Sequence, residues 1–77
     1  MEYNKLYRDV YNMHYQRNKA LTTLPNTSKT IDGFWRVTTE AVTEIANQYE
    51  NHPFAVEMLT AVFQELERTA AALGKKV

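Results

Sequence analysis

The sequence has no cysteine, only two glycines and two prolines, and no net charge among its 77 residues. Without cysteine there is no disulfide, no thiolate metal cluster and no cysteine nucleophile. Two isolated glycines cannot form a glycine-rich phosphate-binding loop. Because a chain of this length buries only about 60% of its unfolded surface, its core is thin. We therefore expect one small helical domain, residues 1–77, that gains stability from contact with another chain.

Long hydrophobic runs are also missing. No stretch approaches the roughly 20 apolar residues that a membrane-spanning helix needs. The first ten residues, MEYNKLYRDV, lack the basic start and apolar run of a signal peptide. The sequence therefore predicts a cytoplasmic protein with no membrane partner. With 44% hydrophobic residues, the chain is too apolar to be disordered.

The neutral total hides a difference between the two halves of the chain. Residues 1–36 hold six basic and three acidic side chains, whereas residues 37–77 hold three basic and six acidic ones. The halves therefore carry net charges of +3 and −3. Such a dipole orients partners or pairs two copies of the chain, although in a sequence this short it also arises by chance.

Apolar residues recur at spacings of three and four along three stretches, which predicts an all-α fold. We expect helices over about residues 2–22, 32–50 and 53–73. No strand is expected, because the sequence shows neither sustained alternation nor a hairpin dipeptide. The simplest packing is an antiparallel up-down-up three-helix bundle, which exists either alone or as a dimer. The alternative is a dimer of two long helices in which the first helix is exchanged between chains.

Capping residues set the expected helix ends. Asp32 is the predicted N-cap of the second helix, with Ser28 or Thr30 as earlier alternatives. Pro53 suits the first turn of the third helix. Gly74 is well placed to end that helix, because glycine adopts the left-handed conformation that helix ends favour.

Residues with catalytic or metal-binding chemistry are scattered. His14 and His52 are far apart, and Ser28 is the only serine of the chain. Glu40 and Glu44 lie four residues apart, but on or beside the solvent side of the second helix, where nothing apolar shifts a pKa. The sequence therefore predicts no enzyme, no metal site and no cofactor.

The most distinctive pattern is a row of tyrosines at every fourth position, Tyr3, Tyr7, Tyr11 and Tyr15. Because an α-helix has 3.6 residues per turn, such a row drifts around the helix. We expect its early members to face the core and Tyr15 to reach the surface. Tyrosine is enriched in protein interfaces, so Tyr7, Tyr11 and Tyr15 are predicted to contact a partner. Core packing with the hydroxyls in water is the alternative.

The third helix carries a second apolar stripe, formed by Phe54, Met58 and Ala61, beside its core stripe. An apolar arc this wide exceeds what a three-helix monomer usually buries. We therefore expect this stripe to contact a protein partner, either a second copy of the chain or another protein. The alternative is that the N-terminal residues or a connector fold over it.

Three polar residues, His14, Arg17 and Asn18, fall on the apolar side of the first helix. Burying such groups without partners is costly. They lie beyond the end of the bundle, or pair with acids such as Glu50 or Glu44, or line a polar pocket or partner surface.

The opposite side of the first helix holds Lys5, Arg8 and Lys19, flanked by Tyr15. Basic groups beside an aromatic ring suit nucleic-acid binding, whereas a solvated outer face is the simpler interpretation. Zero net charge also argues against nucleic acid. The leading hypothesis is a self-associating accessory or regulatory protein, and a nucleic-acid-binding module is the alternative.

Overall fold

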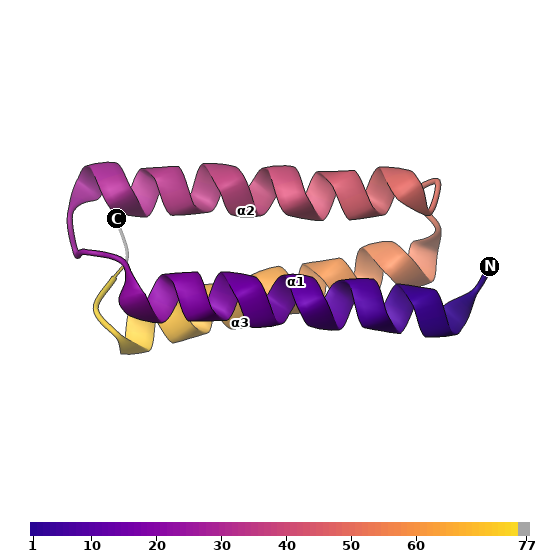
Figure 1. The fold of residues 1–77 in the computed structure, drawn as a ribbon, viewed down its shortest axis with the longest axis horizontal. Coiled ribbons are helices and arrows are strands. Elements are labelled where there is room, and N and C mark those ends of the chain that lie inside the picture. Colours follow the sequence, from indigo (N-terminus) through magenta and orange to yellow (C-terminus); the bar gives the residue numbers. More distant parts are fainter. Residues whose placement is uncertain (76–77) are drawn as a thin grey trace.

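The computed structural model describes residues 1–75, and residues 76–77 lie outside that range. It contains three helices, α1 (Tyr3–Thr23), α2 (Ser28–Gln48) and α3 (Pro53–Ala72), and no strand among the described residues. All three helices pack against one another, which confirms the predicted all-α fold of three helices. In Figure 1, α1 and α3 run in one direction and α2 runs in the other. The molecule is elongated, measuring 39 × 17 × 16 Å.

The start of α2 differs from the prediction. Its N-cap is Thr27, whose hydroxyl accepts a hydrogen bond from the Thr30 N–H at 3.3 Å, while the Thr30 hydroxyl accepts one from the Thr27 N–H at 3.4 Å. Asp32 is therefore not the N-cap, and neither are the alternatives Ser28 and Thr30. The reciprocal pair is a capping box with threonine in place of the usual Glu or Gln. The earlier start brings Ile31 into the helix, where it is buried.

The end of α2 adopts an uncommon backbone conformation. Glu50 and Asn51 both have a φ of 54°. The Glu50 N–H donates to the carbonyl of Asn47 at 3.0 Å, and the Asn51 N–H donates to that of Ala46 at 2.8 Å. This pair of bonds is the Schellman helix end, in which the residue at the position of Glu50 is usually glycine.

Both ends of α3 follow the sequence pattern. The His52 ring accepts a hydrogen bond from the Phe54 N–H through Nδ1 at 3.2 Å, and Pro53 begins the helix. Gly74 follows the helix with a φ of 70°. The predicted roles of Pro53 and Gly74 are therefore confirmed.

Lys75 joins α3 to α1. Its ammonium group donates to the carbonyls of Leu21 and Thr22, at 3.1 Å in each case. A cation at the last turn of a helix is favourable, because that turn carries the negative end of the helix dipole. This contact holds the ends of α1 and α3 together.

The interior is divided into two clusters of buried side chains along the bundle axis. One consists of Leu6, Val10, Met13, Ala55 and Leu59. The other consists of Leu21, Phe34, Leu66 and Ala70. On α2, Thr38 is fully buried. It lies between Phe34, which belongs to the second cluster, and Ala41, which packs against the first. Each helix thus turns one stripe inward and leaves its flanks for other contacts.

Candidate interaction surfaces

The four tyrosines of α1 all reach solvent. The exposed fractions are 48% for Tyr3, 47% for Tyr7, 67% for Tyr11 and 57% for Tyr15. The prediction that the early members face the core is therefore wrong. The core stripe of α1 begins at Leu6, and a step of four residues turns each successive tyrosine about 40° further from it. The row thus begins at the edge of the core and moves outward.

Phe54 of α3 joins this row near the start of α1. Its ring centre lies 5.8 Å from that of Tyr3 and 6.3 Å from that of Tyr7, edge-on in both cases. Farther along α1, the rings of Tyr11 and Tyr15 stack with centres 6.4 Å apart and an interplanar angle of 18°. Phe54 remains 37% exposed. We call these five residues the aromatic face.

The rest of the predicted stripe on α3 is divided between surface and core. Ala61 is exposed, whereas Met58 is half-buried and packs against the first core cluster. The alternative that N-terminal residues cover the stripe holds only in part, because Tyr3 and Tyr7 contact Phe54 without burying it. Phe54 and Ala61 therefore remain available to a partner, and Met58 serves the core.

The flank of α3 beside the aromatic face carries both acidic and basic side chains. Spacings of three and four residues place Ala61, Glu65 and Arg68 on the same side of this helix as Phe54. Arg68 and Glu65 form an ion pair with a nitrogen to oxygen distance of 2.6 Å. The two charges neutralise each other, which leaves Glu57, three residues after Phe54, as an acid of this flank without an ion pair among residues 1–75.

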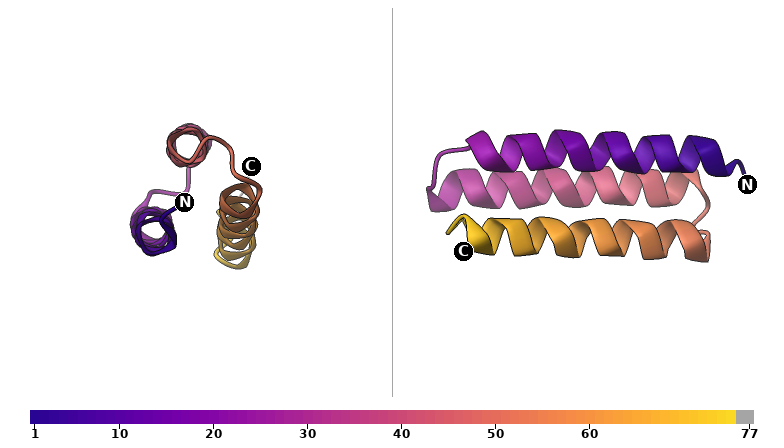
Figure 2. Two further views of the ribbon diagram at one scale, coloured as in Figure 1. Left: turned by 90° about the vertical axis from the view of Figure 1, so that its right-hand side faces the viewer. Right: turned by 90° about the horizontal axis from the view of Figure 1, so that it is seen from below.

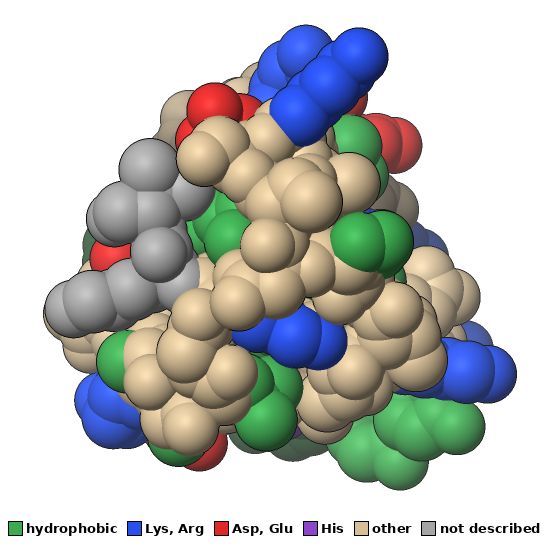
Figure 3. Space-filling view, turned by 90° about the vertical axis from the view of Figure 1, so that its left-hand side faces the viewer, with side chains coloured by type: hydrophobic (Ala, Val, Ile, Leu, Met, Phe, Trp, Pro, Cys, Tyr) green, Lys and Arg blue, Asp and Glu red, His purple; other side chains and the backbone are tan. Residues whose placement is uncertain are grey.

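The end of the molecule at which α1 connects to α2 is a poorer candidate for a protein contact than the long side that carries the aromatic face. Figure 3 looks along the bundle from the end where α1 connects to α2, and there the hydrophobic side chains form separate small patches with basic groups between them. Along the length of α1, by contrast, the exposed tyrosines form two contacting pairs, Tyr3 with Tyr7 and Tyr11 with Tyr15.

The three polar residues of the apolar side of α1 lie within the bundle. His14, Arg17 and Asn18 are half-buried and precede Leu21, which is fully buried, so the explanation that they lie beyond the bundle is wrong. The guanidinium carbon of Arg17 lies 5.4 Å from the centre of the Phe34 ring. Such a cation–π contact offsets part of the cost of partly burying the arginine side chain.

Arg17 also lines a polar groove of about 280 Å³ between α1 and α2, together with Glu44. No ion pair joins Arg17 to Glu44 or Glu50 among residues 1–75. Of the three sequence interpretations, a polar groove agrees best with the position of Arg17. No hydrogen bond joins His14 or Asn18 to Arg17 in the same range, so the three do not form a single site.

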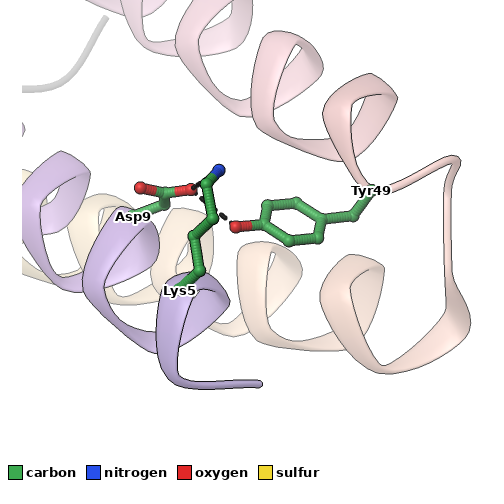
Figure 4. Close-up of polar contacts among 3 residues, drawn as sticks. All are labelled: Lys5, Asp9 and Tyr49. Atoms are coloured by element: carbon green, nitrogen blue, oxygen red, sulfur yellow. Dashed lines mark hydrogen bonds and ion pairs between the residues drawn. The ribbon is translucent and has the colours of Figure 1, made fainter. Parts of the chain in front are cut away.

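A different polar cluster, which sequence reasoning missed, joins α1 to the end of α2. The Tyr49 hydroxyl donates to Oδ2 of Asp9 at 2.6 Å, and the Lys5 ammonium lies 3.3 Å from the same oxygen. Lys5 also lies 5.3 Å from the centre of the Tyr49 ring. Figure 4 shows all three side chains converging between the two helices. The spacing of Lys5 and Asp9 is visible in the sequence, but the arrival of Tyr49 is not.

This cluster shifts the pKa of each member. The hydrogen bond from Tyr49, and next the contact with Lys5, lower the pKa of the Asp9 carboxyl. Partial burial, and next the hydrogen bond to Asp9, raise the pKa of the Tyr49 phenol. The hydrogen bond to Asp9 raises the pKa of Lys5. The arrangement favours a charged Lys5–Asp9 pair and a neutral phenol.

The basic side of α1 is only partly available. Arg8, Tyr15 and Lys19 are exposed, as a nucleic-acid contact requires. Lys5, however, is engaged by Asp9 and by the Tyr49 ring. The candidate phosphate contacts are thus reduced to Arg8 and Lys19.

Residues 1–75 contain no group of three or more His, Asp or Glu side chains placed to hold a metal ion. Within the same range, no helix combines the length and apolar character needed to cross a membrane. Comparison of the chain with protein-family models, curated proteins and solved structures gives no significant match. Functional proposals for this chain therefore rest on its own residues.

Proposed function

We propose that this chain acts by binding protein rather than by catalysis, and that its aromatic face pairs two copies of the chain. The observation that carries the proposal is the aromatic face itself, in which five rings form two contacting groups and each ring remains 37–67% exposed. Clustered exposed aromatic groups on a small protein are typical of protein contacts.

Charge and size agree with pairing of the face with itself. In a two-fold dimer the same surface patch occurs on both sides of the contact, so a net charge there is unfavourable. The Glu65–Arg68 pair adds no net charge to the flank of α3. A standard dimer buries roughly 800 Å² on each partner. The accessible surface of the molecule is 5139 Å², so that area is about a sixth of the whole. One long side of the bundle is large enough to supply it.

Sedimentation velocity over a wide range of protein concentration tests the proposal. The unmodified chain is expected to change from monomer to dimer as concentration rises. Tyr11→Lys, at the most exposed of the tyrosines, places two positive charges in the contact and is expected to weaken the dimer at least about tenfold. Val37→Lys on α2, at a side chain that is 42% exposed and outside the aromatic face, is the matched control.

A chain that stays monomeric at every concentration contradicts the proposal. Equal weakening by Tyr11→Lys and Val37→Lys contradicts the assignment to the aromatic face, because a nonspecific effect of charge then explains both. Circular dichroism confirms that each variant is folded before the comparison is made.

A second candidate function is nucleic-acid binding by the outer side of α1. It is supported by the exposure of Arg8, Tyr15 and Lys19 and by the stacking of Tyr11 on Tyr15. Binding to single strands should then weaken as salt rises, and more so in the double variant Arg8→Glu and Lys19→Glu. Absence of binding at low salt removes this candidate.

A further inference from the structure

A groove of about 370 Å³ lies between α2 and α3, on a side of the molecule that α1 does not reach. Figure 2 shows the three helices end-on at the corners of a triangle, so each pair of helices forms a separate side. The apolar residues of the groove are Val42, Ala46, Val56, Leu59 and Phe63. Threonine and glutamine side chains border them. None of these residues belongs to the aromatic face.

The charged side chains that line the groove and the hollow beside it are acidic. Glu67 lines it directly. Glu40 and Glu44 line an adjoining shallow hollow on α2, which shares Thr39 and Thr43 with the groove. None of these three glutamates forms an ion pair within residues 1–75, and no basic residue lines the groove. Glu67 thus borders the apolar floor from α3, and Glu40 lies beyond its α2 border, whereas Glu44 also lines the groove between α1 and α2.

We propose that this groove binds an amphipathic helix of another protein, whose apolar stripe is flanked by lysine or arginine. An apolar floor between two helices fits the apolar side of a third helix, in the manner of other helix-in-groove complexes. Carboxylates along the border attract basic flanks and discriminate against acidic ones. The α2 side of the groove, from Thr39 to Ala46, is about 11 Å long, which matches two turns of the bound helix.

A second copy of the chain does not fit the groove face to face. Pairing two such grooves brings Glu40 and Glu67 of one copy towards the same acids of the other, and like charges across an interface are unfavourable. The groove and the aromatic face therefore have separate partners, and the test of one is independent of the other.

Trp35 supplies a built-in reporter of binding. It is the only tryptophan of the chain, and its ring centre lies 5.3 Å from that of Phe63 in the groove floor. A helix that covers Phe63 changes the surroundings of the half-buried Trp35 ring. The probe is a synthetic leucine–lysine amphipathic peptide without aromatic residues, and the control peptide has glutamate in place of each lysine. We expect a saturable change in Trp35 fluorescence with the lysine peptide, weaker at high salt, and none with the glutamate peptide.

A matched pair of variants locates the contact. Val56→Gln changes a groove residue that is 38% exposed, and Val37→Gln changes a residue of α2 that is 42% exposed and outside the groove. Val56→Gln is expected to raise the Kd of the lysine peptide about tenfold, as loss of one buried valine predicts, while Val37→Gln leaves it unchanged. Glu67→Gln should raise the Kd several-fold and reduce its salt dependence.

Four outcomes overturn the proposal: no change in Trp35 fluorescence, equal binding of the two peptides, equal effects of the two valine variants, or loss of self-association in Val56→Gln. The last outcome assigns the groove to a second copy of the chain. Unchanged sedimentation of Val56→Gln together with weaker peptide binding supports the groove even if the aromatic face proves not to form a dimer.

Discussion

Thr38 is the buried residue of the described chain whose chemistry fits its surroundings least. It is fully buried, and its hydroxyl has no hydrogen-bond partner. An unsatisfied buried group of this kind costs about 1–3 kcal/mol. Thr38→Val keeps the branched shape and removes the hydroxyl, so we expect the free energy of unfolding to rise by about 1 kcal/mol. Urea denaturation followed by circular dichroism measures this change.

The neighbouring Thr39 provides the control for Thr38. It is exposed on the same helix, so Thr39→Val should change the free energy of unfolding by less than about 0.5 kcal/mol. If Thr38→Val destabilises the protein instead, the hydroxyl has a stabilising partner, such as a bound water molecule.

At the scale of the helices, the end of α2 combines a favourable hydrogen-bond pattern with an unfavourable residue. Glu50 has a φ of 54°, a conformation in which a side chain crowds the backbone and which glycine adopts without strain. Glu50→Gly is therefore expected to raise the free energy of unfolding by about 0.5–1 kcal/mol. Glu57→Gly, inside α3, should lower it by about 1 kcal/mol, because glycine disfavours a helix interior. Thermal and urea unfolding of both variants measure these opposite signs, and destabilisation by Glu50→Gly contradicts the prediction.

Local signals allowed the helices themselves to be predicted. Spacings of three and four residues indicated all three, and Pro53 and Gly74 marked the ends of α3 correctly. The start of α2 was missed because its capping box uses Thr30 where Glu or Gln is usual. That error also left Ile31 outside the expected helix. Helix ends with common caps are thus readable from sequence, and those with rare ones are not.

The candidate surfaces were less predictable than the helices. The tyrosine row was recognised, but its spacing alone does not fix which edge of the core it begins at, and this depends on where α3 packs. The Lys5–Asp9–Tyr49 cluster depends on contact across 40 positions of sequence, which local spacing does not encode. The groove between α2 and α3 likewise arises from how two helices pack. These features belong to tertiary structure rather than to any one helix.

For the whole molecule, the Lys5–Asp9–Tyr49 cluster predicts how stability depends on pH, because it joins the start of α1 to the end of α2. The lowered pKa of Asp9 contributes stability above the ordinary carboxyl pKa of about 4, which is lost as pH falls through the value in the folded state. The raised pKa values of Lys5 and Tyr49 contribute stability below about pH 10, which is lost as pH rises through their folded values. The temperature of thermal unfolding should therefore be constant over a middle range of pH and should fall at both acid and alkaline pH.

Tyr49→Phe tests the acid side of this dependence. Without the phenol, Asp9 loses the hydrogen bond that contributes most to lowering its pKa, so that pKa should rise towards the ordinary carboxyl value. Stability should then begin to fall at a higher pH than in the unmodified chain. A carboxyl NMR titration measures the pKa of Asp9 directly, and Tyr15→Phe, at an exposed ring, is the control. An unchanged Asp9 pKa in Tyr49→Phe shows that the phenol does not hold the carboxylate in solution, and the contact between α1 and this end of α2 must then rest on packing and on the position of Lys5 beside the aromatic ring.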